Sequence, residues 1–325
     1  MSQPSGETVA EHPRGERPVV SIIVAARNGA HQLPTLFAAL ERQTFPKERF
    51  EVIVVDDGSD DPTEAVVEAS SLARVIRCDP PVGVRRARNI GVRAARGDLI
   101  AVTDADTVPD PTWLELGVAR MSDTDADMIG GGVSITLGDS PSIAALVDAM
   151  NWLNQKRCVK QGFAVTANVW ARRETFERWG FFNEEIETHY HEDAEWGQRA
   201  TRGGARLVYA PDVHVSHPPR DRMKEVRGKA YKLGFGLATY RRLPLSAIRN
   251  VPPLFLRPSP FLPPRHIPLE RLRELGHEPT RVQTVLLYLS QWLFVILPRI
   301  AGDFMGELTL ARGRLRAGRV ETASS

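Results

Sequence analysis

The sequence of 325 residues has only two cysteines and an aromatic content of 7%. Cys78 and Cys158 lack the spacing of metal ligands and cannot form a disulfide framework, which indicates a reducing compartment. The first eighteen residues are polar and show no apolar segment, so we expect a disordered leader over 1–18 and no secretory signal. The apolar run 285–297 covers about 13 residues, whereas a bilayer-spanning helix needs ~20.

Charge is nearly balanced over the whole chain but not along it. With 25% charged and 42% hydrophobic residues, the composition is that of a globular protein and excludes a fibrous repeat or wholesale disorder. The net charge is +2, yet residues 219–325 contain 19 Lys and Arg against 8 Asp and Glu, while residues 1–218 contain 23 against 32. An acidic part can hold a cation, and a basic part can meet anionic lipid or phosphate. Nucleic-acid binding is not expected, because the basic part has no recognised motif and no stacking aromatics.

Strands and helices alternate through about the first 110 residues. Buried β-branched runs at 19–25 and 51–55 predict strands, and the helical period of Leu33, Leu36 and Leu40 predicts a helix between them. Further strands are expected at 74–77 and 99–103, with one helix beginning near Pro62 and another over 83–96. This alternation predicts an α/β fold with a mostly parallel central sheet flanked by helices. Ligands bind at the carboxyl ends of such strands.

The remainder of the chain is less regular. The sequence predicts a strand region at 130–132, a helix over 143–156, extended chain at 164–171, a helix over 192–202, and strands at 206–209 and 213–216. From residue 219 onward, a basic helical stretch to about residue 242 is followed by a proline-rich segment over 251–268. We therefore expect a helical and proline-rich C-terminal extension.

Acidic side chains follow two of the predicted strands. Asp104 and Asp106 form a D-x-D pattern after the strand 99–103, and alternation places both carboxylates on one side, where they can hold Mg²⁺ or Mn²⁺. The alternative is a polar turn, in which Asp is common. Asp57 follows the strand 51–55 and can accept hydrogen bonds from a base or ribose. Its alternative role is in an N-cap and turn before the helix at Pro62.

Two later segments carry further candidates. Glu192 and Asp193 begin a predicted helix, where they either favour the macrodipole or supply a general base. Burial would raise the pKa of such a carboxylate, whereas the helix dipole would lower it. His217 ends a predicted strand and is either a structural residue or a metal ligand.

In this order, the motifs resemble the inverting nucleotide-sugar glycosyltransferases of family 2, which have the GT-A fold. The matching pieces are 20–28, 54–60, Gly83 with 87–91, 104–106, 192–193 and 204–217. The resemblance covers about 200 residues, and the ordered set is far more specific than any single piece. One departure is the Ala25-Ala26-Arg27 segment, where many relatives have a proline and often a tyrosine. The Q-x-x-R-W motif of processive polysaccharide synthases is missing, which favours transfer of a single sugar.

The resemblance implies a role for each matching residue. Asp193 would be the catalytic base, and Asp106 and His217 would ligate the metal. The residues implied to bind the nucleotide-sugar are Ala25, Asn28, Asp57, Arg88, Asp104 and Ala105. Asp57 would contact the nucleobase, and Asp104 would face the ribose or sugar. The acceptor is expected to lie near Glu192, Trp196 and Trp152.

The implied organisation is a GT-A catalytic domain over 19–220, with a nucleotide-binding half (19–110) and an acceptor half (111–220), followed by an extension over 221–325. The implied activity is that of an inverting hexosyltransferase. It would move one sugar from a nucleotide-diphospho-sugar to a hydroxyl of a glycan or lipid-linked acceptor, in cell-envelope, exopolysaccharide or glycolipid synthesis, with Mg²⁺ or Mn²⁺. The alternatives are a nucleotidyltransferase of related α/β fold and a non-catalytic nucleotide-sugar-binding module.

The apolar run 285–297 has several interpretations. With Tyr288 and Trp292 inside it and Arg281 and Arg299 flanking it, it is a candidate interfacial anchor. It is equally compatible with a helix packed on the catalytic domain or on a second protomer. We expect a cytoplasmic protein attached peripherally to the inner face of the cell membrane.

Overall fold

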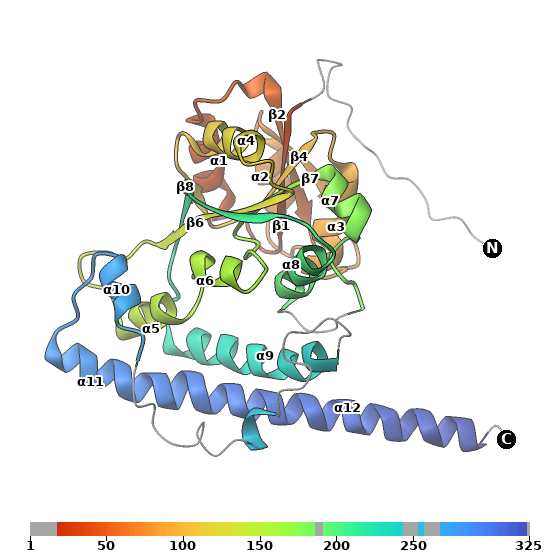
Figure 1. Ribbon diagram of the computed structural model, residues 1–325, viewed down its shortest axis with the longest axis vertical. Helices are drawn as coiled ribbons and strands as arrows, with labels where there is room; N and C mark the ends of the chain where they lie inside the picture. The colour runs from red at the N-terminus through yellow and green to blue at the C-terminus, as the bar shows by residue number, and fades with distance from the viewer. Residues whose placement is uncertain (1–17, 186–190, 243–252, 257–266, 324–325) are drawn as a thin grey trace.

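The computed structural model describes residues 18–185, 191–242, 253–256 and 267–323 (Figure 1). The leader expected over 1–18 and most of the proline-rich segment 251–268 lie outside these residues. The expected division at residues 110 and 220 stays a prediction.

Four parallel strands form the first half of the sheet. They are β1 (Val20–Ala26), β2 (Phe50–Asp56), β3 (Ala73–Arg77) and β4 (Leu99–Asp104), in the order β3-β2-β1-β4. Every residue of β2 is buried, as expected for a strand covered on both faces. Successive side chains point to opposite faces, so Ile22 and Val24 enter one hydrophobic cluster while Ile23 enters another.

The second half of the sheet is mixed. Strand β7 (Asn168–Arg172) runs antiparallel to β4 and to β6 (Met128–Ile135), while β8 (Leu207–His217) is parallel to β6. The short strand β5 (Val108–Pro109) pairs antiparallel with β8 and completes an eight-stranded sheet in the described residues. The predicted α/β fold with a mostly parallel sheet is confirmed, with antiparallel pairs where β7 and β5 enter.

Helices cover both faces of this sheet. The cluster on one face takes its side chains from α1 (Leu33–Glu41), α2 (Thr63–Glu68) and α4 (Trp113–Asp123). The cluster on the other face takes them from α3 (Val84–Ala94), α7 (Arg173–Trp179) and α8 (Glu192–Arg202). The helix predicted over 192–202 is confirmed with those limits.

Two expectations for the second half are corrected. The helix predicted over 143–156 is two helices, α5 (Ile143–Asn151) and α6 (Gln155–Lys160), because Leu153 is left-handed at φ 57° and the Asn154 side chain caps α6. The two strands predicted at 206–209 and 213–216 are the single strand β8. An irregularity in its pairing with β6, between Gly131 and Gly132, accommodates the extra residues.

Long helices form a layer below the sheet domain in Figure 1. They are α9 (Met223–Arg242) and a continuous helix made of α11 (Arg281–Ser290), a π-helical segment (Gln291–Ile296) and α12 (Leu297–Ala323), which we call the C-terminal rod. The short α10 (Glu270–Glu274) packs near α5. The expectation of a run too short to span a bilayer is corrected. Arg281–Ala311 is a helix of 31 residues, which by length and composition alone is long and apolar enough to cross a membrane.

Candidate active site

The carboxyl ends of β4 and β8 meet at a cluster of possible metal ligands. Asp104 ends β4, Asp106 follows it in the turn toward β5, and His217 ends β8. Because β5 pairs with β8, with Val108 opposite Ser216, that turn carries Asp106 to His217. The ligand atoms of the three residues lie within 4.8 Å of one another, and His217 Nε2 lies 3.3 Å from Asp106 Oδ1.

The chemistry of these side chains fits a divalent cation. The Nδ1–H of His217 donates to the Pro218 carbonyl at 2.6 Å, and Nε2 of the same ring faces Asp106. Burial raises the pKa of Asp106, and the charge of Asp104 adds to this, although His217 opposes it. Two carboxylates and one imidazole suit Mn²⁺ or Mg²⁺, and a cation would relieve the repulsion between the two carboxylates.

Arg88 joins this cluster to the start of α8. From α3, it donates to Glu192 Oε1 at 2.7 Å and to Asp104 Oδ1 at 3.2 Å. Burial opposes the charge of Arg88, but the two carboxylates outweigh burial and raise the pKa of Arg88. Glu192 Oε2 is buried and has no hydrogen-bond partner among the described residues. Arg88 thus holds carboxylates from the two halves of the domain together, and its predicted contact with the nucleotide-sugar stays a prediction.

Asp193 is the candidate base, in the first turn of α8. Its Oδ1 accepts a hydrogen bond from the Ala194 amide at 2.7 Å. Burial, followed by the negative charge of Glu192, raises the pKa of Asp193 to about 7, although the Ala194 amide and Arg88 oppose this. A carboxylate with that pKa can accept a proton near neutral pH.

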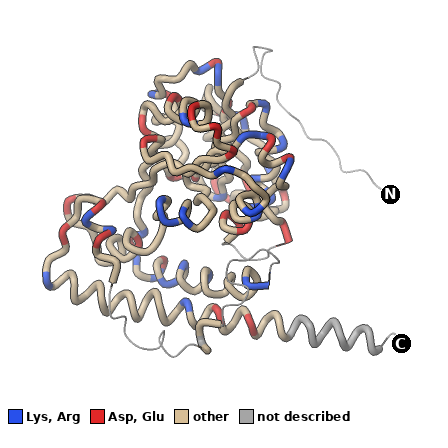
Figure 2. Tube along the Cα trace, viewed as in Figure 1, with Lys and Arg blue, Asp and Glu red and all other residues tan. Residues whose placement is uncertain are grey.

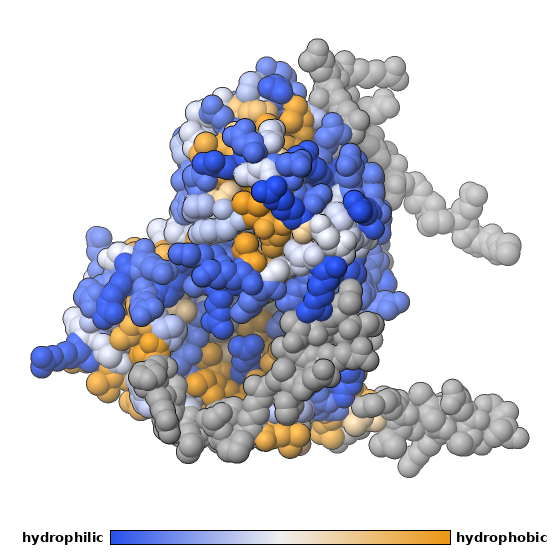
Figure 3. Space-filling view, viewed as in Figure 1, coloured by the Kyte–Doolittle hydropathy of each residue, from blue (hydrophilic) through white to orange (hydrophobic). Residues whose placement is uncertain are grey.

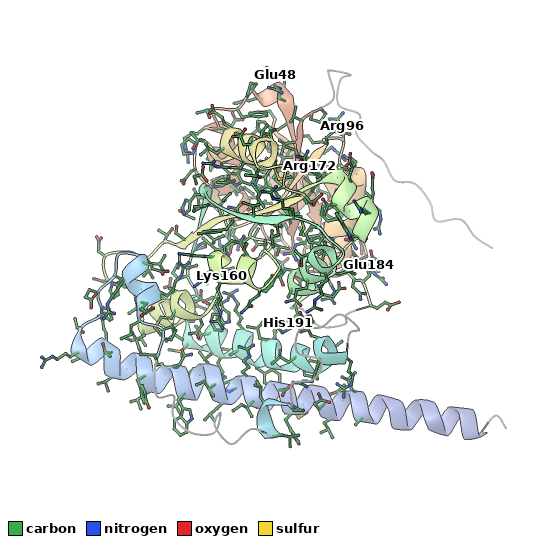
Figure 4. The ribbon with its side chains drawn as sticks, in the orientation of Figure 1. Glu48, Arg96, Lys160, Arg172, Glu184 and His191 are labelled. Carbon is green, nitrogen blue, oxygen red and sulfur yellow. The ribbon has the colours of Figure 1, made fainter. Side chains whose placement is uncertain are left out.

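The residue that precedes α8 fixes the helix against α9. His191 is left-handed at φ 76°, and its Nε2–H donates to the Leu233 carbonyl at 3.1 Å. Its ring stacks on Tyr240 with centroids 5.2 Å apart. Burial lowers the pKa of His191 to about 4, so the ring is neutral at physiological pH. Figure 4 shows His191 between α8 and α9, where it positions the turn that carries Asp193.

Three residues expected to bind the donor lie in or beside the loops that follow β1 and β2. Asp57 Oδ1 accepts hydrogen bonds from the amides of Val82 and Gly83 at 2.6 and 3.0 Å, so it anchors the segment before α3. Asn28 is left-handed at φ 56°, and its Oδ1 accepts from the Asp60 amide at 2.8 Å. Ala25 pairs with Asp104 across β1 and β4. The donor-binding roles of these three residues stay predictions.

The remaining predicted residues are Trp196, Ala105 and Trp152. Trp196 is 1% exposed, stacks on Phe176 and donates its Nε1–H to the Gly180 carbonyl. The apolar face of α8 buries this ring in the core, and the acceptor role of Trp196 stays a prediction. Ala105 is half-buried against the core. Trp152 is half-buried beneath the Lys229 ammonium, 4.7 Å from its ring centroid, and its acceptor role stays a prediction.

Sequence reasoning missed Asp148, one of three charged residues beside the site. Asp148 of α5 is 1% exposed and pairs with Arg220 at 3.1 Å. Burial and the charge of Arg220 lower the pKa of Lys229 to about 8, while Asp148, Asp104 and Asp106 oppose this, which places Lys229 close to the acidic cluster. The available signal was Asp148 itself, a single charge inside the otherwise apolar stretch 143–150.

Comparisons with known proteins agree with this arrangement. The family model described as Glycosyl transferase family 2 matches residues 21–179. The chain is 32% identical over 282 residues to Glycosyltransferase AglE of Haloferax volcanii, covering 85% of this chain and 92% of that one.

Solved structures share the fold at low sequence identity. Mannosyltransferase PcManGT from Pyrobaculum calidifontis, in complex with GDP-Man and Mn²⁺, is similar with a TM-score of 0.62 and 21% identity over 93% of this chain and 90% of that one. TarS 1–349 of S. aureus, in complex with UDP-GlcNAc, is similar with a TM-score of 0.51 and 17% identity over 90% and 92%. The shared architecture is the GT-A fold.

Proposed function

The chain belongs to glycosyl transferase family 2, and from that premise we propose that it transfers one sugar from a nucleotide-diphospho-sugar to an acceptor hydroxyl with inversion of configuration. Family membership makes it a glycosyltransferase of glycoconjugate synthesis and displaces the nucleotidyltransferase alternative. The inversion of configuration, the use of a metal and the roles of the site residues are proposed here.

The donor side of the proposal rests on Asp104, Asp106 and His217. These three residues would hold Mg²⁺ or Mn²⁺. When bound, the cation would neutralise the negative charge that the diphosphate leaving group develops. Asp104 has a second partner in Arg88, which limits the positions that its carboxylate can take.

The acceptor side of the proposal rests on Asp193. Its carboxylate would take the proton of the acceptor hydroxyl while the acceptor oxygen bonds to the anomeric carbon and the bond from that carbon to the diphosphate oxygen breaks. With one base and no covalent intermediate, the displacement is direct and the configuration inverts. The raised pKa of Asp193, about 7, makes this carboxylate a stronger base than an ordinary aspartate.

The observation that carries the proposal is the bridge through Arg88. One guanidinium contacts Asp104 in the metal-ligand cluster and Glu192, the neighbour of the candidate base. The contacts of Arg88 thereby link the proposed leaving-group site to the proposed base, although the two lie far apart in sequence. A module that only bound nucleotide-sugars would have no use for the base.

The donor class is supported by the structural neighbours, and the acceptor class by two cationic side chains beside the site. The structural neighbours named above were solved with GDP-Man and with UDP-GlcNAc, which supports a nucleotide-diphospho-sugar donor here. Lys229 and Arg220 lie beside the acidic cluster and would suit a phosphate, either of the donor or of a lipid-linked acceptor.

The test begins with a thermal-shift screen of UDP-, GDP- and dTDP-sugars in the presence of Mn²⁺. The sugar nucleotide that stabilises the protein is then supplied with candidate acceptors, and the anomeric configuration of the product is determined by NMR. We expect a product of inverted configuration. A product that retains the donor configuration would refute the single-base mechanism, and stabilisation without transfer or donor hydrolysis would favour a binding module.

A further inference from the structure

The C-terminal rod exposes an apolar stripe. Over 281–311 the spacing of the exposed large side chains follows the helical repeat, so they gather on one face. Figure 3 shows apolar surface along the lower edge of the molecule, where Figure 1 places the rod. The members of the stripe are Val282, Val285, Leu286, Leu289, Leu293, Phe304 and Met305.

The charged residues between 282 and 311, which are Arg299, Asp303 and Glu307, lie on the side of the rod that faces α9. Asp303 is fully buried and pairs with Arg241 of α9 at 2.9 Å, and Glu307 pairs with Arg241 as well. Burial lowers the pKa of Arg299, the third charged residue of this stretch. Between Val282 and Ala311, all of which the structure describes, no exposed side chain is charged. Figure 2 shows few charges along the coloured part of the rod.

The contact between the rod and α9 is closely packed through glycine. A Cβ on Gly234 of α9 would collide with the Arg299 carbonyl, and a Cβ on Gly302 would collide with the Tyr231 carbonyl. Close approach at small residues together with polar groups directed between helices is typical of helix pairs in lipid. A helix with its charges inside and its apolar face outside is the reverse of what water favours.

We propose that the C-terminal rod lies in the plane of a membrane interface, with the apolar stripe immersed among the lipid acyl chains. The stripe is a narrow line along a helix about 46 Å long at 1.5 Å per residue, a shape that matches a flat bilayer surface. A protein partner would need a broader patch of about 20–30 residues. Half-exposed Tyr288 and exposed Arg281 add groups that favour the headgroup level.

The rod would lie on the membrane and not cross it. A spanning rod would draw α9 into the bilayer, because α9 packs along the rod, and α9 has exposed Lys224 and Arg227. Crossing would carry these charges into the hydrocarbon or strip α9 from the rod and expose Asp303. This placement is independent of the proposed sugar transfer, so either can fail while the other stands.

The test is flotation of the full-length protein with vesicles of phosphatidylcholine, alone and mixed with phosphatidylglycerol. A stripe variant places three carboxylates on the apolar face: Leu286→Glu, Leu293→Glu and Phe304→Glu. A matched control places three carboxylates at exposed neutral positions of the sheet domain: Ala38→Glu, Ala65→Glu and Ser122→Glu. We expect the wild type and the control to float and the stripe variant to lose at least tenfold of the bound fraction.

Several results would overturn the proposal. One is a wild type that floats with neither vesicle, and another is a folded stripe variant that floats as well as the control. Light scattering that shows a lipid-free dimer dissolved by the stripe substitutions, without lipid binding, would assign the stripe to a second copy. Circular dichroism checks folding, and if the triple variant is unfolded, Leu293→Glu alone is expected to weaken flotation.

Orientation is tested with a C-terminal tag on vesicle-bound protein. Digestion of the tag by protease added outside the vesicles is expected, because a rod in the interface keeps both of its ends on one side. Protection of the tag would contradict the in-plane placement and favour a spanning helix.

Discussion

Replacement of Glu192 by Gln should make the candidate base active at lower pH. Glu192 stands next to Asp193, and its negative charge is the second largest cause of the raised pKa of Asp193, after burial. Glutamine has the same shape and keeps an oxygen to accept the hydrogen bond of Arg88, so Glu192→Gln removes the charge and preserves the bridge. Arg88, no longer neutralised by Glu192, would also favour ionised Asp193.

The magnitude follows from the position of that pKa. The pKa of Asp193 is raised from 3.8 to about 7, with burial as the largest cause and the charge of Glu192 as the second. For the loss of one adjacent like charge we expect a fall of roughly one pH unit, which corresponds to about 1.4 kcal/mol between the two protonation states. At pH 6 the active fraction should rise from about 10% to about 50% of the plateau. The plateau itself should fall slightly, because a less basic carboxylate accepts the proton less readily.

The assay is the pH profile of kcat/KM, which reports the free enzyme, at constant saturating Mn²⁺. The wild type should lose activity as pH falls through about 7, and Glu192→Gln should move this acid limb down by roughly one pH unit. Glu195→Gln is the matched control, because Glu195 lies on the same helix but pairs with Arg199 at 2.8 Å. An unchanged acid limb in Glu192→Gln, or an equal change in Glu195→Gln, would refute the reasoning.

Two further predictions concern the donor side of the site. Asp106→Ala should abolish the Mn²⁺-dependent part of nucleotide binding, since it removes one of three clustered ligands. Calorimetry with and without Mn²⁺ measures this part. Equal metal dependence in the variant and the wild type would count against the cluster. Lys229→Met should raise the KM of the anionic substrate about tenfold, in line with loss of a charge-assisted contact. Lys232→Met, an exposed neighbour on α9, is its control and should leave KM unchanged; equal effects would deny Lys229 a specific role.

The first half of the fold could be predicted because its signals are local. Strands buried on both faces contain a continuous apolar run, as over 52–55 in β2, and α1 repeats its apolar residues at helical spacing. The strand-end positions of Asp104 and His217 followed from the ordered motifs. Their approach to within 4.8 Å depends on the pairing of β5 with β8, a strand of two residues that gave no sequence signal.

Other features could not be predicted, because they depend on backbone conformation and tertiary packing and not on local sequence signals. Leu153 divides a predicted helix by adopting a left-handed conformation, which a leucine does not announce in sequence. Trp196 lies in the core, because the helical repeat of α8 turns it away from solvent. The bridge from Arg88 to Glu192 spans 104 positions and is fixed by tertiary packing alone.

The C-terminal extension could be predicted only in part. The sequence shows the apolar run 285–297, but which of its side chains are exposed depends on the contact with α9. The glycines at 234 and 302 make that contact, and their role appears only once the two helices are placed together.

The central claim, that Asp193 is the base, is tested most directly by Asp193→Asn. Donor affinity and turnover are measured in the same preparation, by calorimetry with Mn²⁺ and by a transfer assay. We expect donor affinity to stay within a few fold of the wild type and turnover to fall by ~10²–10⁴-fold, the contribution typical of general base catalysis. Turnover close to that of the wild type would contradict the account.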